Sequence, residues 1–372
     1  MLDPGFTTEE MARVFSPANR VEAMARFEGA LALALADAGL VPSEDAEAVA
    51  KACQAPVNDP EAVLAATWSE GTPMGPLLDE IRGRLPEEQA RWVHFGTTTQ
   101  DAIDTATMLQ TGAALELLDT ALVGIAGLMG GLVRRHRDQP QIGRTFLQHA
   151  RPTTFGMTVT DWLEPSLRHI SELRQMRSGL VVQLGGPVGN LAAYGDAGVA
   201  VAEALAARLG LDAPAIPWHS ERSRIAALAA ALERCARTMA RVGLDVALLS
   251  SSDVAEITVR TGGSSSMSGK HNPIDSVRAM AATELATAAA GMITGARLSE
   301  LDRGVGGWHA EWVALPLVFQ ATAATVEAMT DCLGSLEVDI GAMSARVGEA
   351  APIDPRLIDG VIADFDRIVG SQ

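Results

Sequence analysis

The feature that most constrains the fold is a set of long segments in which apolar residues recur at helical spacing and proline is almost absent. The segments Asp101 to Arg137 and Ser220 to Ile257 contain no proline. Two more run from Pro273 to Leu298 and from His309 to about Ile340, the last interrupted only by Pro316. Each exceeds the usual length of a helix in a globular protein, and long helices bury their apolar faces by packing into a bundle. The sequence therefore predicts an all-α protein built around a bundle of long helices.

Composition and the positions of proline divide the 372 residues into three predicted parts. Apolar residues make up 48% of the chain but aromatic residues only 4%, so small and aliphatic side chains form the core, which favours helices over sheets. A small helical N-terminal domain is expected over 1–96, with a first clear helix from Arg20 to Leu40. The long-helix bundle is expected over 97–340, and 341–372 is expected to form a short C-terminal remnant.

Charge, cysteine content and the N-terminal residues predict a cytoplasmic protein that binds neither nucleic acid nor membrane. The net charge is −17, which disfavours polyanionic partners. The three cysteines lie far apart without a CxxC pair, which fits a reducing compartment and predicts neither a disulfide framework nor a zinc site. The N-terminus lacks the regions of a signal peptide, and the longest uncharged apolar run, Ala121 to Val133, is too short to span a bilayer.

A polar segment from His94 to Asp101 (HFGTTTQD) leads into the first long run. Thr98 and Asp101 have the spacing of a capping box, which predicts that a helix starts here. Three consecutive threonines are more than a cap needs, and the N–H groups and hydroxyls at a helix start also suit a carboxylate. The segment is therefore either a cap alone or a cap that also binds an anion.

The twelve residues from Gly262 to Pro273 (GGSSSMSGKHNP) interrupt the helical pattern. They do not fit a Walker phosphate loop, because five residues separate Gly263 from Gly269 where the pattern requires four, and His271 occupies the Ser/Thr position. Methionine, lysine and histidine within the segment argue against a flexible linker. The chain has only two lysines, and one of them is Lys270 in this segment. A mobile loop that takes part in chemistry is the remaining interpretation.

Together these segments resemble the signature regions of a known enzyme superfamily. GSSSMSGKHNP is similar to the loop GSSxMPxKxNP of the fumarase/aspartase superfamily, HFGTTTQDAIDT to its HxGxTSQDxxDT segment, and GRTFLQHARPTTFG to its second signature region. MARFEGALALALADAGLVP, WHSERSRI and GGWHAEWVALP resemble more specifically the 3-carboxy-cis,cis-muconate cycloisomerase branch. The resemblance runs from about Phe15 to Pro316, with the motifs in the order of the family.

The resemblance implies a homotetramer whose central helices form one bundle and whose active sites are each shared by three subunits. It implies chemistry without a metal or a cofactor on a small anionic dicarboxylate or tricarboxylate. In the implied reaction, one carboxylate of 3-carboxy-cis,cis-muconate, or of a sulfo analogue, adds to a C=C bond of the same molecule. A proton goes to the neighbouring carbon and a five-membered lactone forms, as in the protocatechuate-type catabolism of aromatic compounds.

The resemblance also implies roles for particular residues. The loop serine that handles the carbon-bound proton corresponds to Ser264, with Ser265 as a near rival. Lys270 is expected to stabilise the negative charge that develops during addition, because preformed donors and cations serve that purpose. The remaining candidates are expected to bind the substrate, and they are Arg20, His94, Thr98, Thr99, Arg144, Gln148, His149, Asn272 and Arg303.

Departures from the family pattern leave two alternatives open. Phe146 stands where fumarase-like members have a histidine, which argues against adenylosuccinate-lyase-like β-elimination, since an amine is a poorer leaving group than an internal carboxylate. Ser268 replaces the proline that follows the loop methionine, and only about 30 residues follow Ile340, so most of the family's C-terminal domain is missing. The alternatives are therefore that adenylosuccinate-lyase-like reaction and a non-catalytic scaffold of the same fold.

Overall fold

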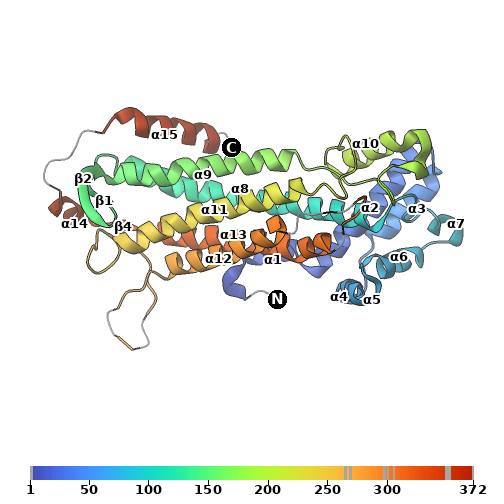
Figure 1. Ribbon diagram of the computed structural model, residues 1–372, viewed down its shortest axis with the longest axis horizontal. Helices are drawn as coiled ribbons and strands as arrows, with labels where there is room; N and C mark the ends of the chain where they lie inside the picture. The colour runs from blue at the N-terminus through green and yellow to red at the C-terminus, as the bar shows by residue number, and fades with distance from the viewer. Residues whose placement is uncertain are drawn as a thin grey trace.

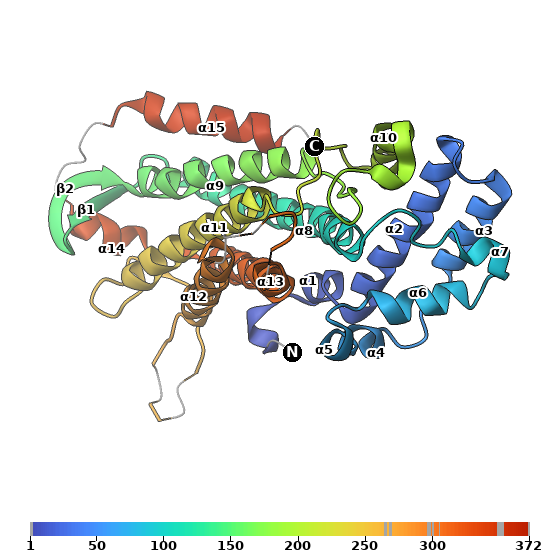
Figure 2. The same cartoon turned by 45° about the vertical axis from the view of Figure 1, so that its right-hand side comes forward.

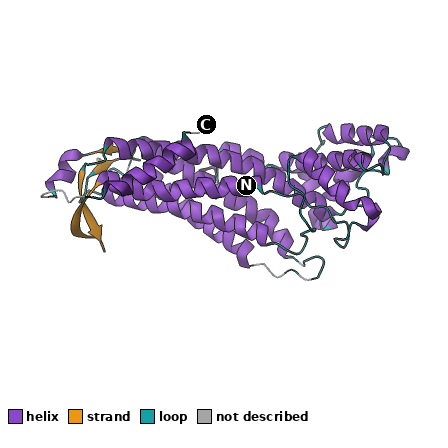
Figure 3. Ribbon diagram, turned by 90° about the horizontal axis from the view of Figure 1, so that it is seen from above, coloured by secondary structure: helices purple, strands orange, loops and turns teal. Residues whose placement is uncertain are grey.

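The computed structural model describes residues 3–263, 266, 267, 270–295, 299, 301–304, 306–347 and 353–370. The molecule is elongated, with a long helical bundle and a cluster of shorter helices at one end (Figure 1). Within the described part of the chain, the strands form two small two-stranded antiparallel sheets and all other regular structure is helical (Figure 3). The predicted all-α fold is confirmed.

Five long helices form the bundle. They are α8 (Thr99–Arg135), α9 (Phe155–Ser178), α11 (Ser223–Leu249), α12 (Ile274–Gly295) and α13 (Gly307–Gly334). Four of them were predicted from the long runs with almost no proline, although α11 and α13 end earlier than predicted. Helix α9 was missed because Pro165 lies inside it. A proline removes one helical hydrogen bond, and here the packing of α9 against α8 and α11 holds the helix together.

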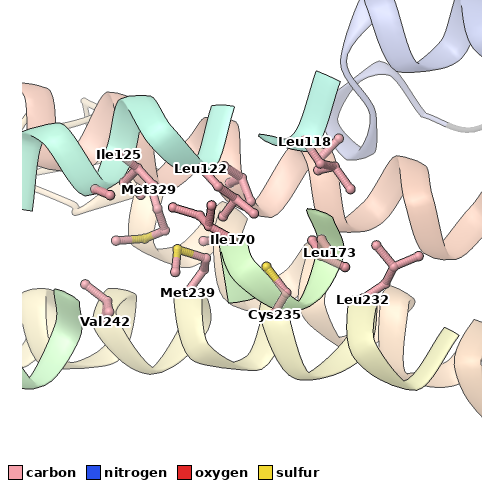
Figure 4. Close-up of a cluster of buried hydrophobic side chains, with 14 of the residues drawn as sticks. Leu118, Leu122, Ile125, Ile170, Leu173, Leu232, Cys235, Met239, Val242 and Met329 are labelled. Carbon is pink, nitrogen blue, oxygen red and sulfur yellow. The ribbon is translucent and has the colours of Figure 1, made fainter. Parts of the chain in front are cut away.

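The bundle core consists of apolar side chains on facing helices. Leu122 and Ile125 of α8, Ile170 of α9 and Met239 of α11 are fully buried and come together in one cluster (Figure 4). Burying a side chain of this kind contributes about 1.5–3 kcal/mol. The shared core, rather than the propensity of any one helix, therefore stabilises the bundle.

Two described helices, α8 and α13, are long and apolar enough to cross a membrane by length and composition alone. In their most apolar windows, 44% of the α8 residues and 67% of the α13 residues are buried inside the protein. Core helices of a bundle meet the same criterion, and the buried side chains of α8 and α13 account for their composition.

A second hydrophobic core lies at one end of the bundle, around α2 (Pro17–Asp37), which matches the helix predicted from Arg20 to Leu40. The shorter helices of this end are α3 (Ser43–Gln54), α4 (Pro60–Ala65), α5 (Thr67–Glu70), α6 (Met74–Arg82) and α7 (Glu87–Ala90). Much later in the chain, the 3-10 helix η2 (Ala192–Ala197) leads into α10 (Gly198–Leu209), which packs against α2 (Figure 2). The first elements, η1 (Pro4–Phe6) and α1 (Glu9–Val14), contact the bundle instead.

The opposite end of the bundle carries both sheets and the last helices (Figure 1). Strand β1 (Pro140–Thr145) pairs with β2 (Gln148–Thr154), and β3 (Ile257–Thr258) pairs with β4 (Glu337–Val338). Helix α14 (Ile340–Ala345) contacts β1, and α15 (Pro355–Val369) returns along α8 and α9.

The contacts that attach helix α15 to the bundle include apolar packing, an aromatic contact and ion pairs. Phe365 lies against Gly130 of α8, where an added Cβ would come within 2.9 Å of the ring, so only glycine permits this approach. Arg134 and Arg137 pair with acidic residues of α15. The residues 341–370 that the structure describes are thus attached to the bundle, while the proposed domain boundaries at 96 and 340 stay predictions.

Candidate active site

Most of the described candidate residues fall into two groups at opposite ends of the bundle. The helix-start group, His94, Thr98, Thr99 and Arg303, lies where α8 begins, beside the shorter helices. The loop-end group, Gln148, His149, Lys270 and Asn272, lies where α8 ends, beside the two sheets (Figures 1 and 2). Ser264 and Ser265 lie outside the described residues.

The helix-start group is organised by the N-terminus of α8. Thr98 is the N-cap and forms the predicted capping box with Asp101, whose Oδ2 accepts the Thr98 N–H at 3.0 Å. Arg303 donates from Nη1 to Thr98 Oγ1 at 3.1 Å and from Nη2 to the Pro187 carbonyl at 3.2 Å. The first N–H groups of a helix have no acceptor within the helix, so a guanidinium and these N–H groups gather at one point. This arrangement can bind a carboxylate.

The side chain of Asp101 connects several segments around the helix-start group. Its side chain is fully buried and accepts hydrogen bonds from Thr97 Oγ1 at 2.9 Å and from the Gly186 N–H at 2.9 Å. Its other oxygen lies 2.6 Å from His219 Nε2. His219 is itself buried, and its contact helps to hold Asp101 in place. The hydrogen bond from Gly186 attaches the loop from Gln183 to Asn190 to the start of α8.

A second buried cluster lies one helical turn further along α8. Asp104 accepts from Arg222 Nη1 at 2.7 Å and from Trp308 Nε1 at 2.9 Å. Arg222 also bonds to Glu311 on α13. Sequence reasoning did not single out these residues, because nothing local signals that 104, 222, 308 and 311 meet. The cluster joins α8, α11 and α13 and keeps the start of α8 in place.

His94 of the helix-start group is paired with a buried carboxylate. Its Nδ1 lies 2.6 Å from Glu28 Oε1 on α2, 66 positions away in sequence. Burial alone would lower the pKa of His94, but the charge and hydrogen bond of Glu28, assisted by Asp101, outweigh burial and the opposing charge of Arg82. The net result is a pKa of His94 above its ordinary value.

Arg20 occupies a separate place. It lies in a pocket of about 190 Å³ with Gln110, Glu311 and Trp312, and its guanidinium stacks 5.1 Å from the Trp312 ring centroid. Burial lowers the pKa of Arg20 to about 10, so the group stays charged at neutral pH. Glu311, in the same pocket, bonds to Arg222 of the cluster around Asp104, so Arg20 lies beside that cluster. The role of Arg20 in substrate binding stays a prediction.

The segment predicted as a second signature region forms the hairpin β1–β2. Thr145 pairs with Gln148 across a two-residue turn made of Phe146 and Leu147, both with positive φ (52° and 61°). Such turns normally contain asparagine or glycine, because other residues are strained there. Phe146 is 99% exposed, and Gln148 and His149 beyond it are also exposed. Strain combined with an exposed aromatic tip is typical of a functional segment that meets a partner.

Arg144, at the base of the same hairpin, is already paired. Its guanidinium forms two hydrogen bonds with the fully buried Glu256, one of them 3.1 Å long. Gln141 donates to the same carboxylate at 3.1 Å, and Arg346 lies 3.6 Å away. Arg144 thus anchors the hairpin to the segment before β3, and its predicted contact with substrate stays a prediction.

The loop that interrupts the helical pattern is closed at its base by backbone pairing. The Gly262 N–H donates to the Asn272 carbonyl at 3.0 Å, and the Asn272 N–H donates to the Gly262 carbonyl at 3.4 Å. Lys270 is exposed in this loop, and His271 Nδ1 lies 3.3 Å from Thr261 Oγ1. The bridge holds Lys270 close to the start of α12, next to the hairpin end of the bundle.

The separation of the two groups is larger than any small substrate. Helix α8 connects them and its 37 residues span about 55 Å. Helix α11 also lies between the two groups, since it runs from beside Asp104 to the segment before the loop. Its 27 residues give it a length of about 40 Å. Within one chain, the helix-start group and the loop-end group are therefore too far apart to contact the same small substrate.

The comparisons with known proteins agree with this architecture. A family model described as a lyase matches residues 6–295. The 3-carboxy-cis,cis-muconate cycloisomerase of Bradyrhizobium diazoefficiens is 36% identical over 355 residues, covering 93% of this chain and 79% of the relative. The enzyme of that name from Pseudomonas aeruginosa is 37% identical over 356 residues, covering 94% of this chain and 78% of the relative.

A solved structure of a relative shows that the similarity extends to the fold. The crystal structure of 3-carboxy-cis,cis-muconate lactonizing enzyme from Pseudomonas putida has a TM-score of 0.87 and 35% sequence identity, covering 92% of this chain and 78% of that one. Sequence motifs, bundle architecture and relatives point the same way. The chain belongs to the lyase family, within the fumarase/aspartase superfamily.

Proposed function

We propose that this chain is a cycloisomerase that converts 3-carboxy-cis,cis-muconate, or a sulfo analogue, to a muconolactone without metal or cofactor. The observation that carries the proposal is the N-terminus of α8, where the Arg303 guanidinium donates to the Thr98 hydroxyl and His94 lies four residues before the cap in the chain. Groups that favour negative charge near a helix start suit a substrate with several anionic groups. Relatives that carry the cycloisomerase name over nearly the whole chain support the same reaction.

The chemistry requires one addition and one proton transfer. A carboxylate oxygen of the substrate forms a C–O bond with an alkene carbon, and the electron pair of the C=C bond moves to the neighbouring carbon, next to a second carboxylate. That carbon then takes a proton from the enzyme, for which we propose Ser264, with Ser265 as the alternative. Lys270 and Asn272 would stabilise the transient negative charge as preformed donors, a contribution worth about 10²–10³ in rate per donor. The net change is an isomerisation, so no co-reactant is needed.

We further propose that the working enzyme is a cytoplasmic homotetramer with shared active sites. The separation of the helix-start and loop-end groups supports this assembly, because one chain cannot present both to the same substrate. Gln148 and His149, exposed on the hairpin beyond the strained turn, would enter the site of a neighbouring copy. A symmetric assembly with antiparallel bundles would place the loop end of one copy beside the helix start of another.

A substrate panel tests the function directly. The purified protein is mixed with 3-carboxymuconate, 3- and 4-sulfomuconate and adenylosuccinate, and the decay of each ultraviolet band is followed. Decay of a muconate band with formation of lactone supports the proposal and identifies the third anionic group. Turnover of adenylosuccinate alone would favour a β-eliminating lyase instead, and no turnover of any compound by folded tetramer would favour a non-catalytic scaffold.

A further inference from the structure

The structure pairs His94 with Glu28, a residue that was not among the candidates from the sequence. We propose that Glu28 is a positioning residue that holds His94 as an imidazolium, so that the remaining ring N–H donates to a substrate carboxylate at the start of α8. The inference deepens the proposed function and rests on it for the identity of the substrate. The pair itself is a property of the fold and can be tested without any substrate.

Burial provides the first argument. The Glu28 side chain is 0% exposed, and among the described residues His94 is the side chain that hydrogen bonds to it. The second carboxylate oxygen, Oε2, is buried without a hydrogen-bond partner in the described part of the chain. An ionised carboxylate in such a place is strongly unfavourable unless an opposite charge lies next to it. A protonated His94 supplies that charge.

The geometry of the ring provides the second argument. Glu28 engages Nδ1, so Nε2 is the nitrogen left to donate, and a protonated imidazole donates from both. The His94 side chain is 15% exposed, so the imidazole is the part of the pair that a ligand can reach. His94 has φ 64°, a left-handed conformation that is costly for a residue other than glycine. Contact with a fixed acid on α2 compensates for this strain and sets the direction of the ring.

The surrounding charges favour the same state. The groups that act on His94 are Glu28 from α2, Asp101 from α8 and Arg82 from α6. Burial and Arg82 lower the pKa of His94, whereas both carboxylates raise it and determine the net direction. Because the shift is upward, His94 keeps its proton to a higher pH than an ordinary histidine and loses it as the pH rises through the raised pKa. In its protonated form, His94 adds a second positive charge to that of Arg303 near the helix start.

The state of His94 can be measured in the unmodified protein. The ring-proton resonances of the seven histidines are followed by NMR against pH, and the His94 signal is assigned as the one lost in His94→Gln. The proposal expects this signal to titrate above the ordinary range of histidine, near pH 6.5. Titration at or below that range overturns the proposal, whether or not the protein is a cycloisomerase.

Kinetics then tests the link to the substrate. In Glu28→Gln the ring loses its counter-charge, so kcat/KM at pH 8 should fall about tenfold, the size of one charge-assisted hydrogen bond, with much less change at pH 6. Glu22→Gln, an exposed glutamate of the same helix, is the matched control and should leave the profile unchanged. An equal loss for Glu28→Gln at both pH values would show a purely structural role and contradict the proposal. If the unmodified protein turns over no muconate, the proposed function fails while the NMR result still decides the pair.

Discussion

The separation of the helix-start and loop-end groups leads to a prediction about mixtures of inactive variants. Arg303→Met removes the guanidinium beside Thr98, and Lys270→Met removes the loop cation. Each variant alone should lose most of its activity, since each removes a charged donor from every site. The two residues are separated by at least the length of α11, about 40 Å, so no site can draw both from the same chain.

The expected recovery can be calculated from the assembly. When equal amounts of the two variants are dissociated and reassembled at random, each helix-start group and each loop-end group is intact with a chance of one half. If a site draws the two groups from different copies, about one quarter of the sites are fully intact. The mixture should therefore recover about one quarter of the wild-type activity per site, measured as lactone formation.

The control is the same procedure applied to each variant alone, which should recover nothing. If both groups came from one chain, every site in the mixture would carry one defect. The mixture would then stay as inactive as the separate variants, even though light scattering showed mixed tetramers. That result would refute the shared site and the reasoning from the length of the bundle.

Three further predictions concern the loop, the cofactor and the His94 pair. Ser264→Ala should lower kcat by about 10²–10⁴ with the tetramer intact, whereas near-wild-type turnover, combined with a loss in Ser265→Ala, would move the proton transfer to Ser265. Incubation with EDTA should leave the rate unchanged, and a loss of activity restored by a divalent metal would contradict the cofactor-free mechanism. Because the pKa of His94 is raised in the folded protein, its contribution to stability is full below its ordinary pKa and disappears as pH rises through the raised value. The difference in Tm between the wild type and His94→Gln should therefore be larger at pH 6 than at pH 9, and an equal difference at both would argue against a charged pair.

The exposed turn of the hairpin bears on the proposed assembly of the chain with copies of itself. Phe146 and Leu147 are apolar, strained and exposed, a combination that costs stability in an isolated chain. The cost is recovered if the turn packs into a neighbouring copy. Gln148 and His149, which follow the turn, are exposed as well. Assembly and substrate binding would then depend on one short segment.

What the sequence determined by itself was the set of local features. Long runs of apolar residues at helical spacing predicted four of the five bundle helices, because this periodicity needs no knowledge of the partner helix. The capping box of Thr98 and Asp101 was also predicted, since its members are three positions apart. The unusual composition of the loop before Asn272 indicated a functional segment for the same local reason.

Tertiary structure alone decided which of these features meet. Glu28 reaches His94 across 66 positions, and Arg303 reaches Thr98 across 205, distances over which no residue pattern carries information. Folding likewise paired Arg144 with Glu256 and placed Arg20 in a pocket with Trp312 and Glu311. A rigid helix of 37 residues fixes how far apart its two ends must lie, and this length separates the helix-start group from the loop-end group within one chain. Spacing along a chain specifies local structure, whereas the charges and distances of a site arise only when distant segments pack.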